Sequence, residues 1–180
     1  GGDIINVVGT YTGEKRNLPG TFKATLNTSS FKLSNVQQTP FADDFLEQLK
    51  KSGWGDVKGK SRGIDYIHMD VHTLADGTVD MAGMFKRIQY GTNATFTIAG
   101  DIVLIRFSGN NAVNFYRIPK DRVSTGNTIG DSYSVFYDDT KTIIFYNDNP
   151  GNLGKDITRD ADNSNVYKNV VLVAAGIPQG

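Results

Sequence analysis

The chain of 180 residues contains no cysteine. This absence excludes disulfide bonds, thiolate metal sites and cysteine nucleophiles, so the domain must fold on its core alone. A domain of this length buries roughly 70% of its unfolded surface, which is enough without cross-links. Excess charge is also absent, because 19 basic residues balance 19 acidic ones. A neutral chain exerts no overall attraction on nucleic acid or anionic lipid, and we expect no nucleic-acid partner.

Long apolar runs are missing as well. No stretch approaches the ~20 residues that a membrane helix needs, so we expect no transmembrane segment. The chain opens with Gly1-Gly2 rather than with Met, and we therefore expect a removed signal or lipid-anchor segment upstream. Abundant Gly, Asn, Thr and Tyr without Cys is typical of bacterial envelope and secreted proteins. We accordingly expect an extracytoplasmic, monomeric protein of the cell envelope or the secreted fraction.

What the chain does contain is a series of short β-type segments between Gly63 and Tyr146. Three pairs of these segments flank short turns rich in Gly, Asp or Asn, as the strands of antiparallel hairpins do. The paired segments are 64–72 with 78–90, 102–107 with 113–118, and 133–137 with 142–146. The pattern predicts one mainly β domain over residues 1–180, folded as an antiparallel barrel or as a sandwich.

Further strands are predicted near both ends of the chain. Segments 4–11 and 20–26 have strand character, the second through alternation of apolar and polar residues, and Phe31-Lys32-Leu33 begins a third strand. The segment from Val170 to Ala175 is apolar on both faces. Such a run predicts a last strand that is central in its sheet or covered.

One amphipathic helix is predicted at about residues 39–52. Thr39 suits the N-cap, Pro40 suits the first helical position, and basic residues close the helix before Gly53. An apolar stripe falls on one face of this helix and consists of Phe41, Phe45, Leu46 and Leu49. We expect that face to pack across the sheet as a lid.

The segment Gly9-Thr10-Tyr11-Thr12-Gly13 follows an apolar strand directly. In this it resembles the opening of the calycin-like β-barrel lipoproteins and of related uncharacterised surface domains of gut bacteria. The resemblance covers a small part of the chain and implies an up-and-down, lipocalin-like barrel outside the cytoplasm. The helix at 39–52 departs from a plain barrel meander. The resemblance implies no catalytic residues for this chain.

His68, Asp70 and His72 are spaced so that they share one face of a strand if the odd-numbered residues 67–71 face the core. Residues two positions apart on a strand lie ~6.6 Å apart and can share a zinc ion. A third ligand is needed from elsewhere, such as Asp80 on the partner strand. The pattern indicates either a metal-dependent hydrolase or an ordinary polar sheet face.

Asp160, Asp162 and Ser164 place oxygen ligands at alternating positions, as calcium loops do. The sixth position is Asn165 rather than Gly and the twelfth is Val171 rather than Glu, which excludes an EF-hand. The segment therefore indicates either an irregular calcium site or an ordinary polar loop.

Trp54, the only tryptophan, lies between two glycines. It suits stacking on a sugar, or it anchors its loop to the core. No nucleophile elbow, phosphate loop or flanking carboxylate dyad is present, so no catalytic residue is assigned. We therefore expect a noncatalytic ligand-binding or interaction protein without a cofactor, which takes a glycan or a small apolar ligand on a face formed by Trp54, Tyr66 and Tyr90. The alternatives are the hydrolase and a purely structural surface domain.

Overall fold

The computed structural model describes residues 3–11, 20–51, 65–90, 95–108, 112–120, 122–125, 133–138, 140–148, 150 and 171–178. Side chains are described for these residues except at 49–51, 65–69, 86–90, 95–98 and 122–125. Apart from one helix, the described elements are all β-strands. The predicted mainly β class is therefore confirmed.

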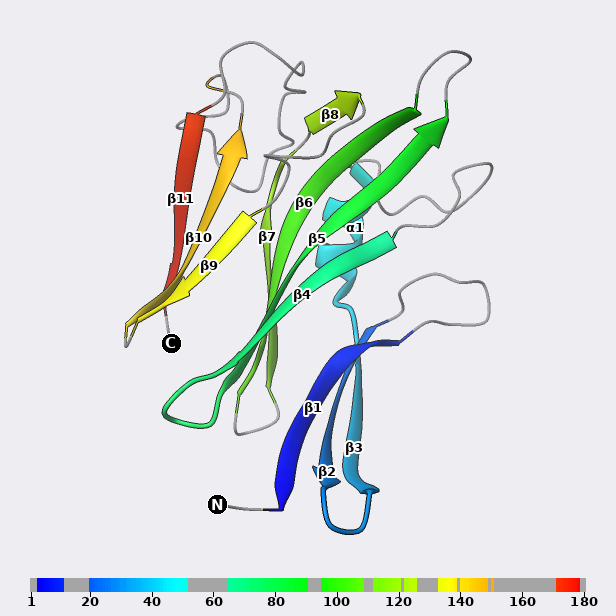
Figure 1. The fold of residues 1–180 in the computed structure, drawn as a ribbon, viewed down its shortest axis with the longest axis vertical. Helices are drawn as coiled ribbons and strands as arrows, with labels where there is room; N and C mark the ends of the chain where they lie inside the picture. The colour runs from blue at the N-terminus through cyan, green and yellow to red at the C-terminus, as the bar shows by residue number, and fades with distance from the viewer. Residues whose placement is uncertain are drawn as a thin grey trace.

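The strands form three antiparallel sheets (Figure 1). The N-terminal sheet has the order β1 (Ile4–Tyr11), β2 (Gly20–Asn27), β3 (Lys32–Pro40). The central sheet has the order β4 (Asp65–Thr73), β5 (Val79–Tyr90), β6 (Thr95–Phe107), β7 (Val113–Ile118), and β8 (Arg122–Thr125) also pairs with β6. The C-terminal sheet has the order β11 (Val171–Pro178), β10 (Lys141–Asp148), β9 (Tyr133–Tyr137). The described strands do not close into a barrel.

All three predicted hairpins are present, since β4 pairs with β5, β6 with β7, and β9 with β10. The turn between β4 and β5 has the geometry that its Asp and Gly residues predict. Gly77 has a φ of 83°, which glycine adopts without strain. The Asp76 Oδ1 atom accepts a hydrogen bond of 2.8 Å from the Thr78 backbone N–H. These are the features that Asp and Gly supply to turns in general.

The helix α1 (Asp43–Lys51) begins later than expected, so the predicted start at about residue 39 is wrong. Thr39 and Pro40 instead finish β3, where they pair with β2. Proline is tolerated at an edge strand because no ladder partner requires its missing N–H. Gly20 lies so close beneath this strand end that an added Cβ would collide with the Thr39 carbonyl oxygen. No helix in the described part of the chain is long and apolar enough to cross a membrane.

The helix covers one face of the central sheet, as the apolar stripe predicted. Phe41 and Phe45 are buried, and both rings lie 5.2 Å from the ring of Phe115 on β7. Val8 of β1 and Leu46 of α1 pack against the same cluster. Its buried members are Phe41, Phe45, Val79, Met81, Phe85, Val103, Ile105 and Phe107. The predicted role of the helix as a lid is therefore confirmed for its described side chains.

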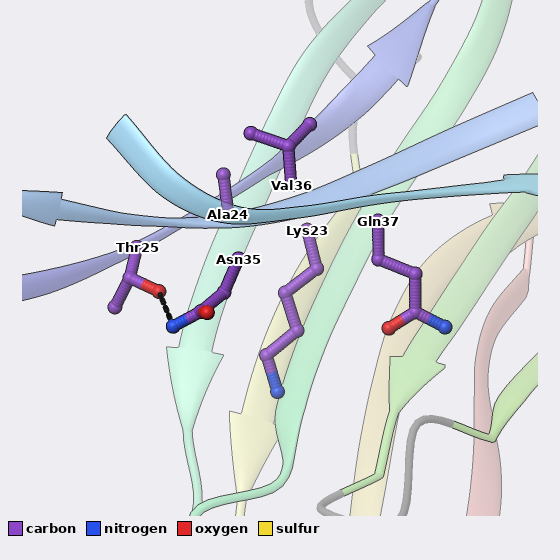
Figure 2. Close-up of a pocket in the computed structure, with 6 residues that line it drawn as sticks. All are labelled: Lys23, Ala24, Thr25, Asn35, Val36 and Gln37. Atoms are coloured by element: carbon purple, nitrogen blue, oxygen red, sulfur yellow. Dashed lines mark hydrogen bonds between the residues drawn. The ribbon is translucent and has the colours of Figure 1, made fainter. Parts of the chain in front are cut away.

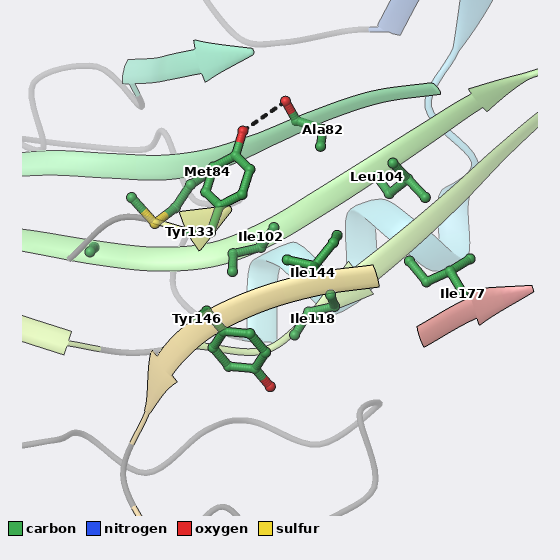
Figure 3. Packing of buried hydrophobic residues seen from close by; sticks show 10 residues of the cluster. Ala82, Met84, Ile102, Leu104, Ile118, Tyr133, Ile144, Tyr146 and Ile177 are labelled. Atoms are coloured by element: carbon green, nitrogen blue, oxygen red, sulfur yellow. Dashed lines mark hydrogen bonds between the residues drawn. The ribbon is translucent and has the colours of Figure 1, made fainter. Parts of the chain in front are cut away.

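The C-terminal sheet covers the opposite face of the central sheet, and this second cluster is drawn in Figure 3. Its buried members are Ala82, Met84, Ala99, Ile102, Leu104, Ile118, Tyr133, Ile144, Tyr146 and Ile177. Neighbouring residues of β6 enter different clusters, since Val103 contributes to the first and Leu104 to the second. The central sheet is thus buried on both faces, which explains the continuous apolar run of β6.

The last strand lies at an edge, so its predicted central or covered position is wrong. Among the described strands β11 pairs only with β10, and Leu172 on its outer face is 71% exposed. Its inward residues belong to or pack against the second cluster, and they are Val173, Ala175 and Ile177. The apolar residues on both faces of β11 therefore reflect one packed face and one exposed apolar face.

A buried ion pair within the central sheet is also hydrogen-bonded to the C-terminal sheet. Arg106 on β6 donates to Asp80 on β5 through Nε to Oδ1 at 2.8 Å and through Nη2 to Oδ2 at 2.9 Å. Thr142 Oγ1 on β10 donates to Asp80 Oδ2 at 2.7 Å, and Arg106 Nη1 donates to the carbonyl oxygen of Pro178 on β11 at 2.5 Å. The hydrogen bonds to Asp80 raise the pKa of Arg106 above its ordinary value, so the guanidinium stays charged.

We predict that Arg106→Met lowers the free energy of unfolding by about 3–5 kcal/mol, because it leaves the buried Asp80 carboxylate without its counter-charge. The double variant Asp80→Asn/Arg106→Met removes both charges and should be clearly less damaging than the single variant. Urea unfolding followed by circular dichroism measures both changes. A loss of less than about 1 kcal/mol in Arg106→Met would contradict the role assigned to the pair.

Candidate functional site

The structure places Asp70 and His72 on the face of β4 that looks toward β9. The register sets His72 opposite Asp80, and the His72 ring stacks on Tyr137 of β9 with centroids 4.1 Å apart and planes at 16°. Val71 between them is 52% exposed, so the condition that this residue faces the core is not met. The cluster beneath α1 contains residues of β5, β6 and β7 and no described side chain of β4. β4 is an edge strand among the described elements, and the helix does not cover its Val71 side chain.

These side chains do not converge on a metal centre in the described part of the chain. Asp80, the suggested third ligand, lies opposite His72 as the hairpin register requires. Both of its carboxylate oxygens, however, accept hydrogen bonds from Arg106 or Thr142. A cation would have to compete with a buried guanidinium for this carboxylate. Among the described residues no group of three or more His, Asp or Glu side chains could hold a metal ion, and the His68 side chain lies outside them.

Several predicted site residues lie outside the description, and they stay predictions. The segments outside it contain Trp54, Asp160, Asp162 and Ser164. Tyr66 and Tyr90 belong to β4 and β5, but their side chains are not among those described. The structure therefore does not test whether Trp54, Tyr66 and Tyr90 form one ligand face, or whether Asp160, Asp162 and Ser164 form a calcium site.

Tyr137 is the unusual residue in the contact between β4 and β9, because its hydroxyl is buried and has no hydrogen-bond partner among the described residues. Burial raises the pKa of Tyr137, and the negative charges of Asp70 and Asp80 raise it further. The phenol therefore stays protonated at neutral pH. The contact with His72 is a ring stack, which contributes packing and supplies no acid–base pair.

A cavity of about 530 Å³ lies at an irregular part of the N-terminal sheet. Figure 2 shows that most of its polar side chains project from one side of β2 and β3, while the two apolar ones project from the other. The polar lining consists of Lys23, Thr25, Asn35 and Gln37, and the apolar lining of Ala24 and Val36. None of these residues was singled out from the sequence.

A β-bulge builds the cavity wall. The pairing of β2 with β3 changes register between Lys23 and Thr25, and Asn35 in the bulged segment has a φ of 51°. Asn is one of the few residues that adopt this left-handed conformation at low cost. Asn35 Nδ2 donates a 3.1 Å hydrogen bond to Thr25 Oγ1, so its Oδ1 atom keeps its acceptor capacity. Bulges re-aim side chains in this way next to binding sites.

The sequence carries one signal for this feature. Asn is depleted in strands, and Ser34-Asn35 interrupts the strand that begins at Lys32. The position of the bulge also depends on how β3 pairs with β2, and a single strand pattern does not contain that information.

The cavity wall is suited to a polar ligand. Lys23 supplies a positive charge and forms no ion pair within the described residues. The Asn35 amide keeps an acceptor oxygen beside its bond to Thr25, the Thr25 hydroxyl can still donate, and the Gln37 amide lines the same wall. Such mixed groups at close spacing match the alternating hydroxyls of a sugar better than an apolar molecule.

Comparison with known proteins finds no match to any protein-family model, curated protein or solved structure. The resemblance to calycin-like lipoproteins therefore stays a prediction. Function has to be argued from the geometry of the site itself.

We predict opposite effects for two tyrosines of β9. Tyr137→Phe removes a buried hydroxyl that has no partner and keeps the ring on His72, so it should raise the free energy of unfolding by about 1 kcal/mol. Tyr133→Phe removes the 2.9 Å bond from Tyr133 Oη to the Ala82 carbonyl oxygen and should lower it by about 1–2 kcal/mol. Urea unfolding compares the two; an equal loss in both variants would contradict the assignment.

We also predict an alkaline loss of stability that Tyr146 contributes. Burial and the charge of Asp148 raise its pKa from 10.0 to about 12. Between these values the unfolded chain has lost the proton that the folded chain keeps, so stability falls as pH rises, by up to ~1.4 kcal/mol per pH unit for this group. Below pH ~10 the contribution is fully present.

The test is urea unfolding at a series of pH values between pH 9 and pH 11, comparing the wild type with Tyr146→Phe. The variant should lose stability less steeply above pH ~10 and should match the slope of the wild type below it. Identical slopes at every pH would show that Tyr146 ionises as readily in the folded chain as in the unfolded one.

Proposed function

We propose that this is a noncatalytic binding protein whose ligand is a glycan held at the cavity between β2 and β3. The observation that carries the proposal is the polar lining of that cavity around Lys23, Asn35 and Gln37. Asn35 lies in the bulge of β3 with a left-handed backbone, and its amide lines the cavity beside Thr25. The polar wall favours a glycan over the small apolar ligand that was the other expectation.

The proposal includes no catalytic step. In the described part of the chain, two buried acid–base pairs are already engaged, Asp101 with Arg117 at 2.6 Å and Asp80 with Arg106 at 2.8 Å. The His72 ring stacks on Tyr137. Lys23, Asn35 and Gln37 can hold and orient a ligand, but they lack a nucleophile with an adjacent base. Recognition of hydroxyl groups requires none of the latter.

The proposal also covers location and architecture. We place the protein outside the cytoplasm, in the envelope or secreted, on the strength of its composition and of the resemblance at its N-terminal end. We favour a layered, sandwich-like arrangement over a barrel, because two separate core clusters lie on opposite faces of the central sheet.

Binding to a glycan array tests the proposal, followed by titration calorimetry of the best glycan. We predict that Lys23→Ala weakens binding about tenfold, since one lost charge-assisted hydrogen bond corresponds to about 1.4 kcal/mol. Asn35→Gly should weaken it to a similar extent. Glycine keeps the left-handed backbone available, so this variant removes the amide and leaves the bulge.

The matched control is Lys32→Ala, which removes an exposed lysine from the same hairpin but not from the cavity lining. It should leave affinity within about twofold of the wild type. Absence of binding across the array, or a glycan whose affinity responds to Lys32→Ala as strongly as to Lys23→Ala, would refute the proposed site.

A further inference from the structure

The strand β1 forms one edge of the N-terminal sheet, and its other side has no strand partner among the described residues. It pairs with β2 in an unbroken register over eight residues, from Ile4 opposite Asn27 to Tyr11 opposite Gly20. The backbone groups on the outer side of such an edge remain available to another extended strand.

The opposite edge, β3, carries the features by which proteins block such pairing, whereas β1 carries none of them. β3 has the bulge with Asn35 at φ 51°, a lysine at its first residue and Pro40 at its last. Bulges, lysines and prolines all disfavour the addition of a strand. β1 has the sequence Ile-Ile-Asn-Val-Val-Gly-Thr-Tyr, with no charge, no proline and no shift of register.

The N-terminal end of β1 is the part of the strand that is most exposed to solvent. Ile4 is 63% exposed and Ile5 is 51% exposed. Figure 1 shows the N-terminal end of β1 at the far end of the sheet, away from the C-terminal sheet. Ile5 lies in a cross-strand row with Leu26 and Leu33, and Leu33 is 58% exposed. An uncharged apolar edge in this position is a docking surface for a strand.

We propose that β1 pairs antiparallel with β1 of a second copy of this chain, which joins two N-terminal sheets into one of six strands. A two-fold axis perpendicular to the sheet places each residue opposite one of the same parity. Ile5 and Val7 of both copies therefore lie on one continuous face of the joined sheet, and an axis at Asn6 sets Ile5 of one copy opposite Val7 of the other. Cross-strand apolar pairs of this kind each contribute roughly 0.2–1 kcal/mol.

A second copy fits this edge because identical uncharged strands pair without like-charge repulsion, and the chain as a whole has a formal net charge of zero. The proposal replaces the monomer expected from the sequence. The sequence alone did not show that residues 4–11 form the edge of a sheet. It goes beyond glycan binding and does not depend on the cavity.

The absence of cysteine from the chain permits a direct test. Single cysteines are introduced in turn at Ile4, Ile5, Asn6, Val7 and Val8, and each variant is oxidised mildly. Only the residue on the two-fold axis faces its own copy, at about 4.5–5.5 Å between Cα atoms, which a disulfide can span. One step along the strand shifts the two cysteines by about 6.6 Å, beyond that reach. We expect a disulfide-linked dimer that is maximal at one position.

The controls separate pairing at the edge from other contacts. Ser34→Cys on the blocked edge β3 should give no cross-linked dimer. Ile5→Lys should raise the dimer dissociation constant, measured by sedimentation, more than about tenfold, whereas Leu33→Lys in the same row should change it less than about threefold. Circular dichroism confirms that each variant is folded.

Three results would overturn the proposal. The first is a wild-type chain that sediments as a monomer at every concentration. The second is cross-linking that is equally strong at Ser34 and along β1. The third is an equal loss of association in Ile5→Lys and Leu33→Lys, which would mean that the exposed apolar face packs against a partner and the β1 edge does not.

Discussion

The guanidinium of Arg106 is the group on which the arrangement of the central and C-terminal sheets depends. It is 4% exposed, and removing a charge from water costs several kcal/mol unless its hydrogen bonds are satisfied. The guanidinium donates two of these bonds to the Asp80 carboxylate within the central sheet and another to the Pro178 carbonyl oxygen in the C-terminal sheet. The relative placement of the sheets must therefore keep β11 within reach of β6. The same requirement occupies the carboxylate nearest to His72 and so works against metal chemistry there.

Because the central sheet is covered on both faces, the outer sheets carry the surfaces that are left for interactions. The N-terminal sheet turns Val8 and Thr21 toward the body of the protein, and Thr21 is fully buried. Its other face exposes Leu33 and Val36 to 58% and 60%. The sheet is thus more apolar on its exposed face than on the face that carries Lys23 and Gln37. This distribution is the reverse of an ordinary half-buried sheet.

Local signals predicted much of the fold, whereas features that depend on the partner strand were missed. The hairpin turn at Gly77 was found because its chemistry is contained in adjacent residues. Pro40 misled the prediction of the helix, because a fixed φ and a missing N–H suit a helix start and an edge strand equally well. The predicted position of β11 was wrong because an apolar run indicates that both faces of a strand are apolar, and it does not indicate that both faces are covered. Asn35 was missed because a bulge exists only relative to β2.

The bulge at Asn35 serves both proposed activities, and the alternation of residues along the strands keeps them apart. It opens the cavity wall beside Lys23, and it disrupts the β3 edge so that only β1 offers regular pairing. Lys23 pairs with Val8, which lies an odd number of residues from Ile5 on β1. Successive side chains on a strand point to opposite faces, so the polar lining of the cavity and the row of Ile5 occupy different faces of the sheet, and Ala24 and Val36 are the lining residues on the face of Ile5. A ligand at Lys23 and a second copy at β1 can therefore be bound together without competing for the same surface.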